Sequence, residues 1–242
     1  MAFKSGRLGE LWLNGVDVSS FFASADFAAK VGMANVTTFK ATWDSFLSGI
    51  AQAILSAGGY YDSADADKVR DTLQAAVGQV SFFPAGAVAI GDQARLLNIN
   101  SSDYKNGSKV SNAVIMDWTA QSTAVIGMGN CLAPLAIYNV GAGIALAGEP
   151  TGLGNGGVQT TTGLVAHLHV TAMTGGDTHS FKLQDATTVG GAYTDIASAA
   201  FVNVTAIGSQ RLIVPGTIRQ FVRLMYTVAG HSATFGVAAA RT

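Results

Sequence analysis

Charged side chains are scarce in this sequence of 242 residues. Only 12% of the residues are Asp, Glu, Lys or Arg, whereas a typical soluble domain carries about 25%. The formal net charge is −1, so the chain has no broad basic field with which to hold nucleic acid or an anionic membrane. Because a monomer ordinarily needs a charged surface to stay soluble, we expect copies of the chain to cover much of this surface. The alternative is a monomer kept soluble by Ser, Thr, Asn and Gln.

Cysteine and long apolar runs are scarce too. Cys131 is the single cysteine, so an internal disulfide is excluded, and "GMGNCLAPL" offers no neighbouring His or acid that would activate the thiol. We therefore expect a packed, inert thiol. The first residues lack the apolar run of a signal peptide, and the apolar segment around 132–147 is too short and too interrupted to span a membrane. We expect synthesis in the cytoplasm and no membrane segment.

Catalytic motifs are also missing. The sequence contains no Gly-x-Ser-x-Gly elbow, P-loop or His-Glu-x-x-His, and "GLGNGG" at 152–157 does not follow a strand and open a helix. "LVAHLHVTA" places His167 and His169 two residues apart, which fits either a metal clamp or one face of a strand. The other two histidines, His179 and His231, show no ligand spacing. We expect a strand face, no metal, no cofactor and no enzyme.

Local patterns predict a mainly β chain with one short helix. Asn14-Gly15 lies between two apolar runs and predicts a hairpin over 10–22. "DSADADKVRDTLQAAVG" has capping acids and an apolar face, which predict a helix near 63–77. After Gly78 the runs become short, β-branched and aromatic. "SFLSGIAQAILSAGG" remains ambiguous, because its apolar spacing favours a helix while its glycines interrupt it.

Two β domains are expected. Residues 142–163 are rich in Gly and Thr and are interpreted as a linker between a first domain, 1–141, and a second, 164–242. In "IRQFVRLMYTV" one face carries Val222, Leu224 and Tyr226 while the other carries Arg223 and Met225. The second domain should therefore be an antiparallel sandwich or jelly roll.

The order of these segments resembles a known family. "LWLNGVDVSSFF", then "VTTFKATWDSFLSGIAQAILSAGGYYD", then an acid-capped helix and "FFPAGAVAIGDQARLLN" are similar to the tail tube proteins of long-tailed bacteriophages. The resemblance covers roughly residues 8–135 and rests on turns and small residues. Phe39-Lys40 departs from the Phe-Gly usual in the family. The resemblance implies a tail-tube-like antiparallel β-sandwich or barrel with a strand over 50–61, and a second sandwich like those appended to some family members.

The family's function follows as an implication of this resemblance. Subunits would form hexameric rings that stack into a tube, meet other tail proteins at its ends and conduct double-stranded DNA in the virion. The second sandwich would lie outside, so a chain ending near Gly141 should still form tubes. An alternative function is a virion-surface or carbohydrate-binding or receptor-binding module in the second half.

The resemblance also suggests residues for the assembly. We expect the block 36–47 to make stacking contacts through Phe39, Trp43 and Phe46, because aromatic side chains are favoured at interfaces; they could instead fill the core. A DNA channel should avoid cations, and Asp26 and Asp44 are candidate lumen residues. Both could equally be ordinary solvated or capping acids.

Overall fold

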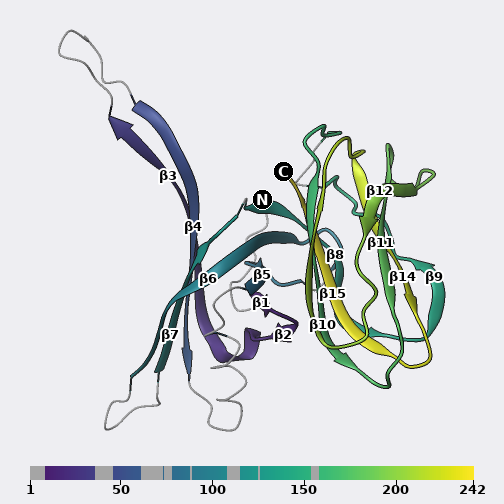
Figure 1. Cartoon of the computed structure of the whole chain (residues 1–242), viewed down its shortest axis with the longest axis horizontal. Helices are drawn as coiled ribbons and strands as arrows, with labels where there is room; N and C mark the ends of the chain where they lie inside the picture. Colours follow the sequence, from purple (N-terminus) through teal and green to yellow (C-terminus); the bar gives the residue numbers. More distant parts are fainter. Residues whose placement is uncertain are drawn as a thin grey trace.

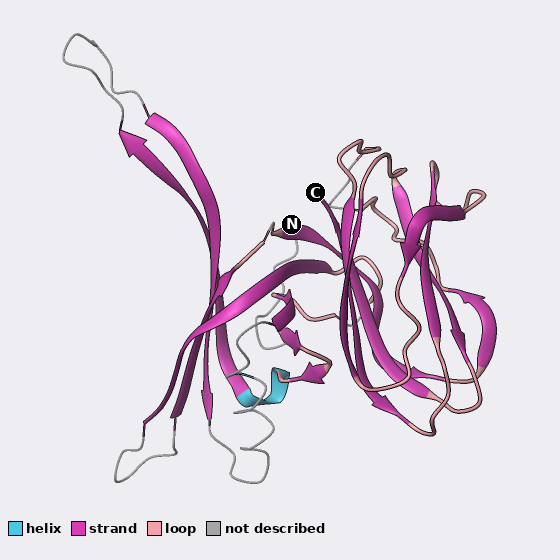
Figure 2. Ribbon diagram, viewed as in Figure 1, coloured by secondary structure: helices cyan, strands magenta, loops and turns pink. Residues whose placement is uncertain are grey.

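A computed structural model of the chain describes residues 9–35, 46–60, 73, 78–87, 89–107, 115–124, 126–153 and 158–242. Their regular structure is antiparallel strand, apart from a 3-10 helix η2 (Ser19–Phe21) and Leu73 in a helical turn (Figure 2). The mainly β fold class is confirmed. The strands are β1 (Glu10–Leu13), β2 (Val16–Asp17), β3 (Phe22–Asn35), β4 (Phe46–Tyr60), β5 (Gly78–Phe83), β6 (Gln93–Gly107), β7 (Ile115–Ser122), β8 (Gly127–Tyr138), β9 (Gly141–Ala145), β10 (Leu164–Met173), β11 (Ser180–Ala186), β12 (Thr194–Ala200), β13 (Gly208–Val214), β14 (Phe221–Val228) and β15 (Ala233–Arg241).

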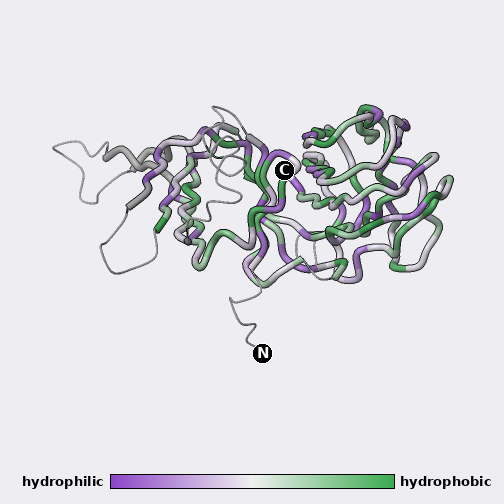
Figure 3. The backbone as a smooth tube through the Cα atoms, turned by 90° about the horizontal axis from the view of Figure 1, so that it is seen from below, coloured by the Kyte–Doolittle hydropathy of each residue, from purple (hydrophilic) through white to green (hydrophobic). Residues whose placement is uncertain are grey.

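The described strands form two sheets. The larger has the order β13-β10-β15-β8-β6-β5-β1-β2, with β7 joining β6 to β4 and β4 pairing β3. The smaller has the order β12-β11-β14-β9 and lies at the end of the molecule farthest from the β3–β4 hairpin (Figure 1). Seen from below, hydrophilic and hydrophobic residues mix along the strands instead of gathering in one apolar stretch (Figure 3). This mixing is expected for strands that carry a buried and an exposed face.

The predicted hairpin at the start of the chain is present. Asn14 and Gly15 both have positive φ, 50° and 80°, which is the conformation of a two-residue type I′ turn. The turn joins β1 to β2, with Leu13 opposite Val16. Its twist matches that of the flanking strands, so the Asn-Gly pair explains the tight connection.

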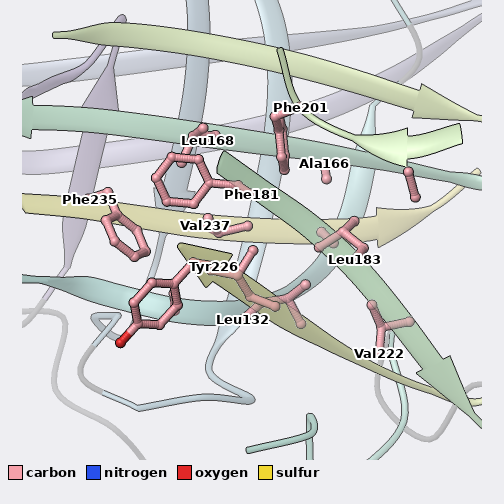
Figure 4. Close-up of a cluster of buried hydrophobic side chains, with 14 of the residues drawn as sticks. Leu132, Ala166, Leu168, Phe181, Leu183, Phe201, Val222, Tyr226, Phe235 and Val237 are labelled. Atoms are coloured by element: carbon pink, nitrogen blue, oxygen red, sulfur yellow. The ribbon is translucent and has the colours of Figure 1, made fainter. Parts of the chain in front are cut away.

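Strand β10 is buried on both faces over Leu164–Val170, and each face serves a different core. Leu164, Ala166, Leu168 and Val170 face the smaller sheet in one apolar cluster. In Figure 4, Phe181 lies close to Leu168, and Leu183 and Phe201 belong to the same cluster as the β15 side chains Phe235 and Val237. This interdigitated layer is the core of the second sandwich, which matches the sandwich predicted for this half.

The opposite faces of β10 and β15 contact the first half of the chain. Val165 of β10 clusters with Trp12, Phe83 and Leu96, and so do Ala238 and Ala240 of β15. A Cβ built on Gly236 would lie 2.6 Å from the Trp12 ring, so the indole packs directly against the β15 backbone. Trp12 and Phe83 have ring centroids 4.3 Å apart, a contact of a kind that contributes about 0.5–1.5 kcal/mol beyond burial. The large sheet thus curls over itself and joins the two halves.

The segment "SFLSGIAQAILSAGG", whose sequence left helix and strand open, forms strand β4. Ala53, Leu55 and Ala57 are buried while alternate residues are partly exposed, which is the period of a strand. The strand predicted over 50–61 from the family resemblance is confirmed, over 46–60. Gly59 permits a close approach at the end of this strand, because a Cβ there would lie 1.8 Å from the carbonyl oxygen of Phe21, the last residue of η2.

The helix predicted near 63–77 can be compared with the structure at one residue. The helix near 63–77 lies outside them except for Leu73, which is helical and fully buried and whose carbonyl accepts a hydrogen bond from the Ser101 hydroxyl.

The segment 142–163, which was expected to be a free linker, is hydrogen-bonded to a strand where the structure describes it. Its start belongs to β9, and the amides of Leu146, Glu149 and Leu153 donate to carbonyls of Leu224, Val222 and Gln220. The described part of this segment therefore lies along β14. Although its Gly- and Thr-rich composition is typical of a loop, backbone hydrogen bonds hold this segment beside the strand.

Candidate functional site

The predicted assembly residues fall around the hairpin β3–β4. Phe39, Trp43 and Asp44 lie outside the described residues, in the segment that connects the two strands in sequence. Phe46 begins β4, with its backbone opposite Asn35, and its side chain is outside the description. Asp26 lies in β3 opposite Ser56 and is exposed. The stacking and lumen roles of these five residues stay predictions.

The β3–β4 hairpin projects from the body of the molecule (Figure 1). Residues 22–35 of β3 pair with residues 46–59 of β4, whereas β7 pairs only with residues 54–60 of β4. Among the described strands, β3 has β4 as its single partner. Before Ile54, β4 pairs with β3 alone among the described strands, and the Ala53 amide also donates to the Ser122 hydroxyl at the end of β7. The other edge of β3 carries unpaired backbone groups in the described structure.

Exposure changes along this hairpin. Near its base, Leu55 and Ala57 of β4 join the apolar cluster of the first half, and Phe22 stacks on Trp118 with ring centroids 6.2 Å apart. Farther out, Ala28, Ala29 and Lys30 are successive exposed residues, although successive residues of a strand face opposite sides. Both sides of β3 are thus open to solvent around Ala29, whereas Ala53 of β4, which lies opposite Ala29, is buried. The free edge of β3 suits contact with another chain.

The two histidines of β10 form the centre of a buried polar cluster. His167 and His169 are fully buried on the same face of the strand, with ring centroids 6.1 Å apart. The Ser81 hydroxyl of β5 lies between them, 3.3 Å from His167 Nδ1 and 3.0 Å from His169 Nε2. The amide of Gly15 donates to His169 Nδ1 at 3.3 Å. The strand-face prediction is confirmed, and the cluster lies between the two halves of the chain.

These contacts assign the proton of His169. Its Nδ1 accepts from the Gly15 amide, so neutral His169 carries its proton on Nε2 and donates it to Ser81. The Ser81 hydroxyl also contacts His167 Nδ1, and the direction of that hydrogen bond depends on the His167 tautomer. A metal would have to displace these hydrogen bonds, and the described residues contain no group of three or more His, Cys, Asp or Glu placed to hold one.

Burial keeps both imidazoles neutral. It lowers the pKa of His169 to about 3. Burial, with the neighbouring His169 and Arg211 adding in the same direction, also holds the pKa of His167 well below its ordinary value, although the Val80 carbonyl opposes the shift. Each proton taken up here would place a charge in a region without solvent. The cluster is consequently a polar contact between the halves that depends on neutral rings.

The thiol of Cys131 is fully buried, as the sequence predicts. Burial raises the pKa of this thiol, and the charges of Asp92 and Glu10 raise it further. A thiolate is the reactive form of cysteine, and a raised pKa disfavours the thiolate, whereas a nucleophilic cysteine needs a lowered pKa.

Among the described residues, no helix is long and apolar enough to cross a membrane.

Sequence reasoning missed a polar row on the outer face of the smaller sheet. Lys182 and Gln184 of β11, Asp195 of β12 and Arg223 of β14 are linked there by hydrogen bonds. The alternation of "IRQFVRLMYTV" did place Arg223 opposite the buried face, and Val222, Leu224 and Tyr226 are indeed buried. Its partners come from other strands, so no local pattern could have identified them.

Comparisons with known proteins give fold likenesses at low identity. No family model matches the chain, and no curated protein matches it. A chain of the virion of a native gene transfer agent particle aligns at 12% identity over 52% of this chain and 98% of its own, with a TM-score of 0.42. The SPP1 Dit protein, described as a paradigm of the hub adsorption apparatus in phages that infect Gram-positive hosts, aligns at 10% identity over 97% and 99%, with a TM-score of 0.38. A chain of the phage p2 baseplate in its activated conformation aligns at 8% identity over 97% and 98%, with a TM-score of 0.36.

Proposed function

We propose that this chain is a ring-forming structural subunit of the tail of a long-tailed bacteriophage, and that its first half forms the tube wall. The sequence resemblance over residues 8–135 and the scarcity of charge support this role. The proposal assigns no catalytic step and no cofactor. The observation that carries it is the projecting β3–β4 hairpin with its unpaired edge.

An isolated two-stranded hairpin is marginally stable in water, and a long exposed strand edge is a template for pairing with another chain. β3 is 14 residues long and β4 is 15, more than twice the usual strand length of about 5–6 residues. Pairing of this edge with a neighbouring copy would satisfy its backbone groups. Such a contact joins different surfaces of two subunits, and it closes into a ring when the rotation between copies allows it.

The remaining roles follow from ring formation. Stacked hexameric rings would make a tube that conducts double-stranded DNA, with other tail proteins at its ends and the second sandwich outside. Asp26 is exposed on the hairpin, where it could contribute a belt of negative charge to the bore, because a ring repeats each side chain by its symmetry. Phe39 and Trp43, between β3 and β4 in sequence, would provide stacking contacts.

Two adjacent proline substitutions test the edge. Ala28 lies opposite Ile54 and Ala29 opposite Ala53, and in an antiparallel pair one of two successive residues directs its N–H toward the partner while the other directs it toward the free edge. Proline removes that N–H. Of Ala28→Pro and Ala29→Pro, one should keep the thermal midpoint of the monomer yet lose polymers in negative-stain micrographs. The other should lower the midpoint, since it breaks the hairpin itself.

Wild-type chain should form rings or tubes under the same conditions, which provides the reference. If wild type stays monomeric at high concentration, or if both proline variants polymerise like wild type, the proposed ring contact through β3 is wrong.

A further inference from the structure

The outer face of the smaller sheet carries a preorganised polar row. Lys182 Nζ donates to Asp195 Oδ2 at 2.7 Å, and Gln184 Nε2 donates to Asp195 Oδ1 at 2.7 Å. Arg223 Nε donates to Gln184 Oε1 at 2.8 Å, and Gln184 and Arg223 are directly opposite each other in the sheet. The row crosses three hydrogen-bonded strands, so its geometry is set by the sheet and not by a loop.

Arg223 is held in a fixed orientation at one end of this row. Its guanidinium carbon lies 4.2 Å from the centroid of the Tyr193 ring, which gives a cation–π contact on one face. Its Nε is used by Gln184, while neither Nη has a hydrogen bond to a described residue. The Nη edge of a guanidinium matches the two oxygens of a carboxylate or phosphate. Lys182 is neutralised by Asp195, so Arg223 is the uncompensated charge of the row.

A surface hollow of about 260 Å³ adjoins the other end of the row. Lys182 belongs to both, because it binds Asp195 and also lines the hollow. Ser180, Thr227 and Asn203 give the hollow hydroxyl and amide groups, and Met225 gives it an apolar wall. Gly143 lines it as well, with φ of 63°, and a Cβ there would lie 3.2 Å from the methyl carbon of Met225. The hollow is smaller than the ~300–1,000 Å³ of pockets for drug-sized ligands.

We infer that this face binds an acidic saccharide, with Arg223 contacting its carboxylate or phosphate and the hollow receiving a sugar ring. A sugar ring presents hydroxyl groups at its rim and C–H groups on its faces, which matches polar groups beside an apolar wall. Between the two contacts, Gln184 and Asp195 hold Arg223 and Lys182 in place through their hydrogen bonds. The site lies on the sheet farthest from the β3–β4 hairpin (Figure 1). It therefore does not depend on the proposed ring contact.

The test is a titration of the full chain, followed by NMR chemical shifts of the Arg and Gln side chains and by calorimetry. The probes are glucuronate, glucose 6-phosphate, glucose and inorganic phosphate. We expect glucuronate or glucose 6-phosphate to shift the Arg223 and Gln184 signals, with glucose and phosphate each binding at least about tenfold more weakly. Arg223→Gln should weaken the acidic sugar at least about tenfold, because it removes a charge-assisted bidentate contact. Arg223→Lys should fall between the two, since it keeps the charge and loses the fork.

Lys105→Gln is the matched control, because Lys105 is an exposed cation in the first half, paired with Asp103. It should leave saccharide binding unchanged. The inference is overturned if neither acidic sugar shifts the row, if inorganic phosphate binds as tightly as glucose 6-phosphate, or if Arg223→Gln and Lys105→Gln have equal effects. It is also overturned if assembled particles bury this face against a neighbouring copy. The proline variants of β3 should bind the sugar as wild type does. A loss of ring formation can therefore be distinguished from a loss of saccharide binding.

Discussion

At the scale of single residues, the buried histidine pair makes stability depend on pH. His169 has an ordinary pKa of 6.5 when unfolded and about 3 when folded, and the pKa of His167 is lowered in the same direction. Below about pH 6.5 the unfolded chain binds protons that the folded chain does not, so the free energy of unfolding falls as the pH falls toward the folded pKa values. The limiting slope is about 1.4 kcal/mol per pH unit for each histidine.

Denaturant unfolding at pH 7, 6 and 5 measures this slope. The double substitution His167→Gln with His169→Gln should reduce this slope, whatever its effect on stability at pH 7. The part due to His179, whose pKa is also lowered by burial, should remain. His231→Gln is the control, because His231 is exposed and paired with Asp177. A slope unchanged by the double substitution would contradict the assignment of the pH dependence to this pair.

The environments of His167, His169 and Cys131 were predictable from the sequence only in part. Spacing alone predicted that His167 and His169 share a face, because strands alternate with a period of two. It could not predict that Ser81 and the Gly15 amide would hydrogen-bond to them, since Ser81 is 86 residues from His167 and Gly15 is 154 residues from His169 in the chain. For Cys131, the sequence predicted a packed thiol because no activating neighbour stands beside it, and the thiol is buried in the structure.

At the scale of elements, the turn between β1 and β2 should tolerate no side chain at Gly15. Its φ is 80°, and an added Cβ would lie 2.4 Å from the Gly208 carbonyl oxygen. Gly190 has a similar φ of 73° with nothing within 4 Å of the added Cβ. Gly190→Ala should therefore cost only the left-handed strain of about 1–2 kcal/mol. Gly15→Ala should cost about 1–3 kcal/mol more, because the turn must move away from β13.

Equilibrium unfolding of the two variants gives the comparison. Equal losses of stability would mean that the turn relaxes freely and is not fixed against β13. Elements with local signals, such as Asn14-Gly15, were predictable because the turn chemistry is contained in two residues. The conformations of strand β4 and of the segment after β8 were harder to predict from the sequence. Their conformations depend on pairing with β3, β7 and β14, and this pairing is invisible to local periodicity.

At the scale of the whole molecule, the structure changes the expectation that a chain ending near Gly141 would still form tubes. β8 is paired on one side with β6 and on the other with β15, so removal of residues 142–242 leaves β8 with a new open edge. It also uncovers Trp12, Phe83 and Leu96, which pack against β10 and β15. Two β domains, the second of them a sandwich, were predictable from the strand patterns and turns. Their shared sheet was not, because it requires pairing across about a hundred residues.

We therefore expect residues 1–141 alone to be insoluble or to lack a cooperative thermal transition, because burial of large aromatic side chains contributes roughly 1.5–3 kcal/mol each. Circular dichroism melting and the soluble fraction after expression measure this outcome. Co-expression of residues 142–242 supplies the control, since the separate piece can return β10 and β15 to their places and should restore solubility. A soluble 1–141 chain that melts cooperatively would show that the first half folds independently. In that case the contacts of Trp12 with the second half would be those of a docked neighbour, and tubes built from the first half alone would again be the expected product.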